Sequence, residues 1–229
     1  MPSTSQQAEK EPPPRAIAID GPVASGKSAV GSRVARELGH RFIDTGLMYR
    51  AVTVVALERG IDLHDEAPLA QLAANLSLTI EPPARVLVDA VDVTPKLRTA
   101  EVGEAVSLVS RVPGVREAMV KLQRQLARDG GVVMVGRDIG TVVLPDAPLK
   151  LYLDASPEER VRRRHEELRA AGQDISDDEV RQELALRDRI DSERATSPLR
   201  PAADAVHIDT DRLSLDEVVA RILKLACPS

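Results

Sequence analysis

One eight-residue segment near the start of the chain constrains the fold more than any other feature: Gly21-Pro22-Val23-Ala24-Ser25-Gly26-Lys27-Ser28. It fits the pattern Gly, any four residues, Gly-Lys and then Ser or Thr, which defines a phosphate-binding loop (P-loop) between a strand and a helix. The context agrees with this interpretation rather than with an ordinary glycine turn. An apolar run at 16–19 precedes the segment, and residues 28–38 show helical spacing before Gly39. The sequence therefore predicts a strand, a P-loop and a helix here.

Each residue type in this loop has a chemical task. Glycines let backbone amides turn inward around a phosphate, and the N-terminus of the following helix adds a positive dipole end. Lys27 is expected to reach the β- and γ-phosphates, and the Ser28 hydroxyl is expected to bind Mg²⁺ as the cofactor of a nucleoside triphosphate such as ATP. The predicted ATP-binding residues are Gly21, Pro22, Val23, Ala24, Ser25, Gly26, Lys27, Ser28 and Ala29.

The rest of the chain alternates strand and helix patterns. Apolar runs at 41–43, 132–135, 150–153 and 205–208 predict strands, and helical spacing recurs at 47–58, 100–110 and 115–128. Three later helices each begin with the capping-box pattern Ser-x-x-Glu, at Ser156, Ser176 and Ser214. This alternation predicts an α/β fold, with a parallel sheet flanked by helices.

Three regions depart from the alternation. Residues 1–14 are mostly Ser, Gln, Glu and Pro, and we expect a disordered tail before one folded domain at 15–229. Short apolar runs separated by turn residues predict a small antiparallel β insert at about 77–98. Arginines and glutamates crowd the start of the segment at about 160–175, which is interpreted either as a solvated charged face or as a short helical lid.

Composition excludes several classes of protein. No apolar run approaches the ~20 residues that span a bilayer, and 1–15 lacks the apolar stretch of a signal peptide, so we expect a cytoplasmic protein without a membrane partner. The single cysteine, Cys227, permits no intrachain disulfide and no cysteine metal cluster. Aromatic residues make up 1% of the chain, which argues against a nucleic-acid partner. The only asparagine, Asn75, precedes Leu76, so the Asn-Lys-x-Asp guanine reader of GTPases is absent.

Arginine usage and three further groups of residues indicate additional phosphate contacts. Only six of the 31 basic residues are lysines, which reflects either codon usage or a need for forked donors that face phosphate. The groups are Asp44–Arg50 after the second strand, Gly136-Arg137-Asp138-Ile139-Gly140-Thr141 after a buried strand, and Arg187, Asp191 and Arg194 at helical spacing. Taken singly, each is also compatible with a solvated arginine, a turn salt bridge or a surface ion-pair row.

Together with the P-loop, these motifs resemble those of the bacterial cytidylate kinases, from about residue 15 to 226. That family transfers the γ-phosphoryl group of ATP to CMP or dCMP. The resemblance implies a nucleoside monophosphate kinase fold with a nucleotide-binding insert and a lid. It also implies ATP and CMP or dCMP as binding partners, a place in pyrimidine metabolism and a monomeric enzyme.

The resemblance also implies roles for individual residues. The CMP phosphate would be held by Arg50, Arg137 and Arg187, the ribose by Asp191, and cytosine by Ser107, Arg116 and Asp138, with Thr45 also in the CMP site. Arg194 and one or more of Arg160, Arg163 and Arg164 would neutralise the moving phosphoryl group. The expected catalytic residues are Lys27, Arg137, Arg163, Arg187 and Arg194.

Two positions depart from the family's pattern. Val135 stands where many relatives carry an acidic residue that can orient water on Mg²⁺, so either another carboxylate, such as Asp20, takes this role, or Ser28, water and phosphates suffice. Ile190 replaces an arginine found in some relatives. Two alternatives stay open at this point: a kinase of the same fold with another small acceptor, such as UMP/CMP or shikimate, and a non-catalytic nucleotide-binding module.

Overall fold

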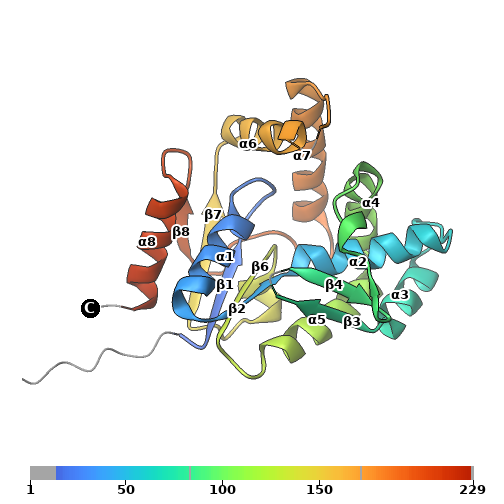
Figure 1. Cartoon of the computed structure of the whole chain (residues 1–229), viewed down its shortest axis with the longest axis horizontal. Coiled ribbons are helices and arrows are strands. Elements are labelled where there is room, and N and C mark those ends of the chain that lie inside the picture. The colour runs from blue at the N-terminus through green and yellow to red at the C-terminus, as the bar shows by residue number, and fades with distance from the viewer. Residues whose placement is uncertain (1–13, 83, 171, 228–229) are drawn as a thin grey trace, which may run out of the picture.

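A computed structural model describes residues 14–82, 84–170 and 172–227, and a five-stranded parallel sheet forms its centre (Figure 1). The strand order is β2-β6-β1-β7-β8. The expected disordered tail lies, except for Pro14, outside the described residues. The strands are β1 (Ala16–Asp20), β2 (Arg41–Asp44), β6 (Val132–Gly136), β7 (Leu149–Asp154) and β8 (Val206–Asp209).

Helices cover both faces of this sheet. On one face lie α1 (Lys27–Leu38) and α8 (Leu215–Ala226), which pack together. On the other face lie α2 (Thr45–Glu58) and α5 (Pro113–Ala127), with α3 (Glu66–Asn75) against α5 and α4 (Ala100–Ser110) against α2. The expected α/β fold is confirmed; α3 was not foreseen.

The central strand shows why the sheet is buried on both faces. Ile17 and Ile19 pack in the cluster beneath α1 and α8, whereas Ala18 packs in the cluster beneath α2 and α5. All three side chains are 0% exposed. Because successive side chains of a strand point to opposite faces, a continuous apolar run is what a strand covered on both sides requires.

The insert forms the predicted antiparallel sheet of three strands. These are β3 (Leu78–Glu81), β4 (Arg85–Val88) and β5 (Val91–Asp92), followed by a 3₁₀ turn at Thr94–Lys96. Val86 is fully buried and belongs to the same core cluster as α2, so the insert is attached to the body of the domain.

Two packed helices, α6 (Pro157–Ala170) and α7 (Asp177–Glu193), stand above the carboxyl end of the sheet and cross each other at a large angle (Figure 1). A small apolar cluster joins them, formed by Val161, Leu168, Val180 and Leu184. The segment 160–175 therefore comprises most of α6 and the turn that leads to α7. Within the described ranges, none of the helices combines the length and apolar content that crossing a membrane requires.

The three predicted capping boxes did not all form. Those of Ser176 and Ser214 are complete. At Ser156 the prediction is half wrong: its hydroxyl accepts from the Glu159 amide, but the Ser156 amide donates to Asp211 instead. The Glu159 carboxylate is occupied by Arg162 and Arg163, whose charged hydrogen bonds are stronger than a bond from a neutral amide.

Candidate active site

The P-loop follows the carboxyl end of the central strand, where ligands collect in open parallel sheets. Gly21 is required there, because its φ is 151° and a Cβ would lie 2.0 Å from the Leu153 carbonyl oxygen. Lys27 folds back over the loop and donates to the Pro22 carbonyl and, at 3.3 Å, to Ser25 Oγ. Burial lowers the pKa of Lys27 well below its usual value, and the charge of Arg137 acts in the same direction. The lysine is therefore held close to a second positive group.

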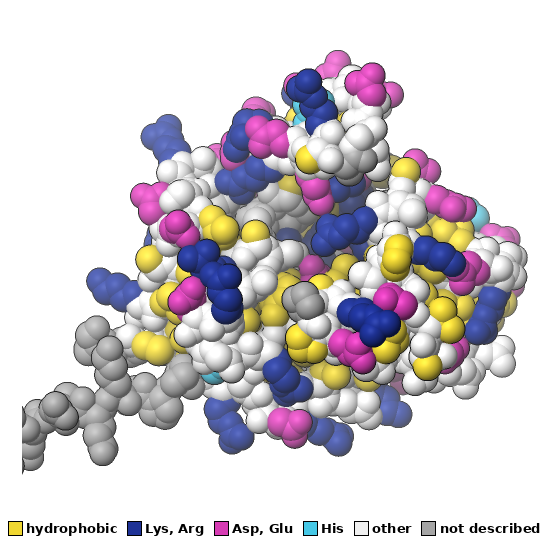
Figure 2. Space-filling view, in the orientation of Figure 1, with side chains coloured by type: hydrophobic (Ala, Val, Ile, Leu, Met, Phe, Trp, Pro, Cys, Tyr) yellow, Lys and Arg dark blue, Asp and Glu magenta, His cyan; other side chains and the backbone are white. Residues whose placement is uncertain are grey.

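A cavity of about 290 Å³ opens beside the loop, bounded by α2, α4, the end of β6 and α7. Figure 2 shows Lys and Arg side chains gathered in the hollow below α6 and α7. Most residues that the sequence singled out line this cavity. They are Val23, Ala24, Gly26, Lys27, Ser28, Ala29, Thr45, Arg50, Ser107, Arg116, Arg137, Asp138, Arg187, Asp191 and Arg194.

Arginines crowd one side of the cavity; Arg187 bonds to Glu183 at 3.3 Å, whereas Arg50 has no acidic partner among the described residues. The pKa of Arg50 is lowered to about 10. Burial is the main cause, and the charges of Arg187, Arg164 and Arg98 also contribute. The pKa of Arg187 is lowered as well, first by burial and then by Arg137. Like charges held together in a partly dry site favour an anionic ligand, which would relieve their repulsion.

Asp191 is the main acidic group among these arginines. Its carboxylate accepts from Arg137 Nε at 2.8 Å and lies 3.6 Å from Arg194 Nη1. Burial acts to raise the pKa of Asp191, but Arg137 and Arg194 outweigh it and hold the value below the usual range. Arg194 is not part of the helix: α7 ends at Glu193, and Arg194 caps it with an extended ψ of 138°.

A buried ion pair closes the opposite end of the cavity. Arg116 Nη2 donates to Asp138 Oδ2 at 2.5 Å, and Arg116 Nη1 donates to the Ser110 carbonyl at 3.2 Å. Their side chains are only 2% and 5% exposed. The second Asp138 oxygen has Arg194 at 3.8 Å, and both Asp138 and Ser107 line the cavity. This end therefore presents a carboxylate oxygen and a hydroxyl to a ligand.

The segment that follows β6 contains a turn of π-helix, Ile139–Val143, which was not predicted from the sequence. Asp20 accepts from the amides of Ile139 and Gly140, each at 2.7 Å. Burial raises the pKa of Asp20 to about 6, although both hydrogen bonds oppose the rise. Both Asp20 oxygens are therefore occupied with the backbone that carries Arg137 and Asp138.

Another carboxylate lies beside the P-loop serine. Ser28 Oγ donates to Asp44 Oδ2 at 2.7 Å, while Asp44 Oδ1 accepts from the Gly46 amide as the N-cap of α2. Val135, by contrast, packs its side chain in the core cluster under α1, where a Cβ on Gly31 would meet it at 2.5 Å. Ser28 and Asp44 thus supply hard oxygen atoms of the kind that Mg²⁺ prefers.

The arginines of α6 go to different places. Arg164 lines the cavity, whereas Arg160 pairs with Asp188 and donates to the Val23 carbonyl. Arg163 donates to Thr210 and, with Ser25, lines a second cavity of about 460 Å³ on the other side of the P-loop. The expected grouping of Arg163 with the other catalytic arginines is thus not what the structure shows. Gly21 and Pro22 line neither cavity.

Comparison with known proteins decides the family. The cytidylate kinase family model matches residues 17–227. The chain belongs to the cytidylate kinase family. It is 53% identical over 211 residues to a cytidylate kinase of Pelotomaculum thermopropionicum, covering 90% of this chain and 93% of that protein. With a cytidylate kinase of Geobacillus kaustophilus it shares 54% identity over 212 residues, covering 91% and 95%.

A solved structure supports the fold of this cytidylate kinase family member. An uncharacterized protein of Eubacterium ventriosum matches 92% of this chain and 97% of its own, with a TM-score of 0.52 and 12% sequence identity. At that identity the likeness speaks for the fold alone.

Several residues of the site were not found from the sequence. Arg98 and Glu167, which line the mouth of the main cavity and lie 3.4 Å apart, come from the insert side and from α6. The second cavity is lined by the loop from Thr210 to Leu215. Two buried side chains, Tyr49 in the wall of the main cavity and Gln123, were given no role from the sequence. Tyr49 stands within the Asp44–Arg50 segment, but the others stand in no recognisable motif, so only the folded chain brings them to the site.

Proposed function

We propose that this chain transfers the γ-phosphoryl group of ATP to CMP or dCMP, as an enzyme of pyrimidine nucleotide metabolism. The observation that carries the proposal is the cluster of partly buried arginines, Arg50, Arg137 and Arg187, which line the same cavity as the P-loop. Two phosphate sites that face each other are what a phosphoryl transfer between nucleotides needs. Membership of the cytidylate kinase family and the names of its relatives support the choice of acceptor.

ATP would place its phosphates against the P-loop amides, with its nucleoside end toward the second cavity beyond Ser25. Lys27 would exchange its bonds to Pro22 and Ser25 for the β- and γ-phosphate oxygens. The CMP phosphate would bind among Arg50, Arg137 and Arg187, and Asp191 would accept from a ribose hydroxyl.

The transfer step requires no general base, because the accepting phosphate oxygen is already anionic. A bond forms between that oxygen and the γ-phosphorus as the bond to the β–γ bridging oxygen breaks, which leaves ADP and CDP or dCDP. Lys27, Arg164 and Arg194 line the same cavity and would neutralise the charge on the moving group. Catalysis would then consist of positioning and electrostatic stabilisation.

Cytosine would be read at the opposite end. Arg116 holds one Asp138 oxygen, so the other can accept a hydrogen bond from the N4 amino group. Uracil carries a carbonyl oxygen in that place, which a carboxylate repels. We expect Asp138→Asn to narrow the preference for CMP over UMP about tenfold or more, because an amide can also donate. Equal losses of kcat/KM for both acceptors would contradict this role.

Mg²⁺ fits beside the P-loop, where it would be bound by the Ser28 hydroxyl and the ATP phosphates; it would bring its charge to the phosphate oxygens there. Asp44 is the carboxylate placed to accept a hydrogen bond from its water, since it already accepts from Ser28. Asp20 is committed to two backbone amides, and Val135 is packed in the core.

The segment 160–175 is proposed as a lid over the main cavity. Among the described residues, the exposed pair Arg98–Glu167 links this segment to the insert side of the cavity and is weak enough to open. Arg160 and Arg163 tie the start of the segment to the Val23 and Thr210 carbonyls on the P-loop side. Hydrogen exchange of this segment should slow when ATP and CMP bind together. An unchanged exchange rate in the doubly liganded protein would rule the lid out.

A coupled assay of ADP release from Mg-ATP tests the proposed function, with CMP, dCMP, UMP, AMP, GMP and shikimate offered separately. We expect release with CMP and dCMP well above the rest, and a loss of most turnover in Lys27→Ala, about a hundredfold or more. ATP binding without release with any acceptor would instead support a nucleotide-binding module.

A further inference from the structure

Two buried polar side chains below the base-reading end of the cavity have no part in the reaction described above. Tyr49 on α2 is 7% exposed, and Gln123 on α5 is 1% exposed. Among the described residues, neither the Tyr49 hydroxyl nor the amide atoms of Gln123 have a hydrogen-bond partner. Buried polar groups are costly unless they serve a purpose, so this pair calls for an explanation.

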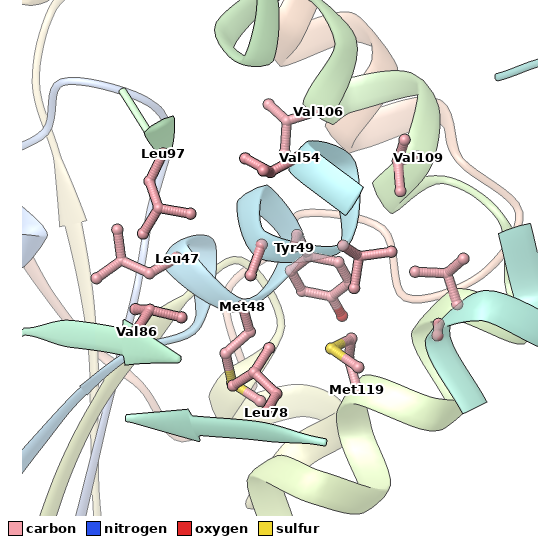
Figure 3. Packing of buried hydrophobic residues seen from close by; sticks show 14 of the residues in the cluster. Leu47, Met48, Tyr49, Val54, Leu78, Val86, Leu97, Val106, Val109 and Met119 are labelled. Atoms are coloured by element: carbon pink, nitrogen blue, oxygen red, sulfur yellow. The ribbon is translucent and has the colours of Figure 1, made fainter. Parts of the chain in front are cut away.

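Gln123 and Arg116 both lie on the buried face of helix α5. Arg116, Met119 and Gln123 are three and four residues apart, so they share the buried face of that helix. Figure 3 shows the hydroxyl end of Tyr49 directed at Met119. Burial raises the pKa of Tyr49 to about 12, and both the Arg116 charge and the Gln123 amide are close enough to oppose the rise.

Tyr49 also contacts the guanidinium group itself. The Arg116 Cζ atom lies 5.3 Å from the centre of the Tyr49 ring, which is a cation–π distance. Two other sides of the guanidinium are held by Asp138 and by the Ser110 carbonyl. The Tyr49 ring therefore restricts the movement of the Arg116 guanidinium on a side that neither Asp138 nor the Ser110 carbonyl holds.

We propose that Tyr49 and Gln123 are positioning residues for base discrimination. The Gln123 amide lies beside the Tyr49 hydroxyl, the ring supports Arg116, and Arg116 holds Asp138 with one oxygen available to the cytosine amino group. The proposal rests on the proposed function, since it explains how the same site separates CMP from UMP. Without the Tyr49 ring, the Arg116–Asp138 pair could rotate and move the carboxylate away from the uracil carbonyl. Loss of the ring should therefore reduce the preference for CMP over UMP more than it reduces kcat.

The test is the ratio of kcat/KM for CMP to that for UMP in three variants. Tyr49→Leu removes the ring, and we expect the ratio to narrow about five- to tenfold, through a higher KM for CMP with kcat changed less than twofold. Gln123→Met and Tyr49→Phe keep the volume and the packing and remove only the polar contact. We expect each of these to narrow the ratio about two- to threefold.

Thr53→Val is the matched control. Thr53 is 0% exposed and lies one turn further along α2, where its hydroxyl bonds to the Tyr49 carbonyl and not to Arg116. It should alter thermal stability and leave the CMP-to-UMP ratio unchanged. If Tyr49→Leu does not fold, Tyr49→Phe and Gln123→Met decide the question.

A double-mutant cycle separates positioning from general destabilisation. In an Asp138→Asn background, Tyr49→Leu should change the ratio no further, because its route to the base has been removed. Folded variants that keep the wild-type ratio, or effects that multiply independently of Asp138, would overturn the proposal. A wild-type protein that phosphorylates CMP and UMP equally would refute the proposed base reading itself, and a protein with neither activity would refute the proposed function; the inference falls in both cases.

Discussion

Arg50 in the cavity and Arg162 on the outer face of α6 are the same residue type in opposite electrostatic surroundings. Arg162 bonds to the carboxylates of Glu159 and Glu166, at 2.6 Å and 2.7 Å, and these hydrogen bonds raise its pKa. Among the described residues, Arg50 donates only to the Leu97 carbonyl, and burial lowers its pKa to about 10. The outer arginine has its counter-charges within the chain, whereas the inner one lies among other arginines.

The difference separates arginines that serve the fold from arginines that await a ligand. An exposed, fully paired arginine contributes at most about 1 kcal/mol, and its removal leaves the site intact. A buried arginine without a counter-charge costs stability in the free protein, and evolution retains such a cost where binding recovers it. An arginine that lacks an acidic partner within the chain is therefore a candidate for ligand binding, whether or not it stands in a motif.

The largest expected effect contrasts one arginine of each kind. Arg50→Ala should lower kcat/KM for CMP about a hundredfold or more, because a charged contact to the acceptor phosphate is lost. Arg162→Ala should change it less than twofold, since Arg162 lies 55% exposed among glutamates. The coupled ADP-release assay measures both. Comparable losses in the two variants would break the distinction between paired and unpaired arginines.

Binding of a simple anion gives a smaller effect on stability. Sulfate or phosphate at ten times its Kd should stabilise the free protein by about 1.4 kcal/mol, which raises Tm by about 3–6 °C for a chain of this size. Arg50→Met should abolish most of this rise, and Arg162→Met should retain it. A rise of equal size in both variants would place the anion outside the cavity.

The same contrast shows how far the sequence could be interpreted. The P-loop, the parallel strands and the antiparallel insert were predictable, because they depend on local patterns of glycine and apolar residues. The neighbours of the α6 arginines were not predictable: Arg162 and Arg163 share Glu159, whereas Arg160 bonds to the Val23 carbonyl and Arg164 to Glu167 and Glu183. The capping-box prediction at Ser156 fails for the same reason. The Glu159 carboxylate bonds to Arg162 and Arg163, which lie one turn further along the helix, and not to the Ser156 amide.

Long-range partners explain the remaining gaps. Asp20 and the π-helix at Ile139–Val143 are 119 residues apart at their nearest hydrogen bond, so no window along the chain reveals their contact. Gln123 meets Tyr49 only because α2 and α5 pack on the same face of the sheet. Residues that hold other residues in place therefore escape motif analysis, whereas residues that touch phosphate tend to stand in motifs.

The smallest expected effect concerns Glu159, an acidic partner of the exposed arginine Arg162. Hydrogen bonds from Arg162 lower the pKa of Glu159 to about 2, although burial opposes them, and Arg163 adds to the lowering. Because the pKa in the folded state lies below the unfolded value of 4.5, the contribution of Glu159 to stability is complete above pH 4.5 and is lost as pH falls toward 2. In Glu159→Gln this part of the acid destabilisation should disappear, about 0.5–1 kcal/mol at a surface site.

Glu166→Gln is the matched control, because Glu166 bonds to the same arginine but is 64% exposed, against 17% for Glu159. Urea unfolding of the ligand-free protein at several pH values between 5 and 2 measures both slopes. We expect the flatter slope in Glu159→Gln, since its carboxylate serves two arginines and is better shielded from water. If the two variants have equal slopes, partial burial adds nothing to a paired arginine, and Arg50 then differs from Arg162 only in lacking an acidic partner among the described residues.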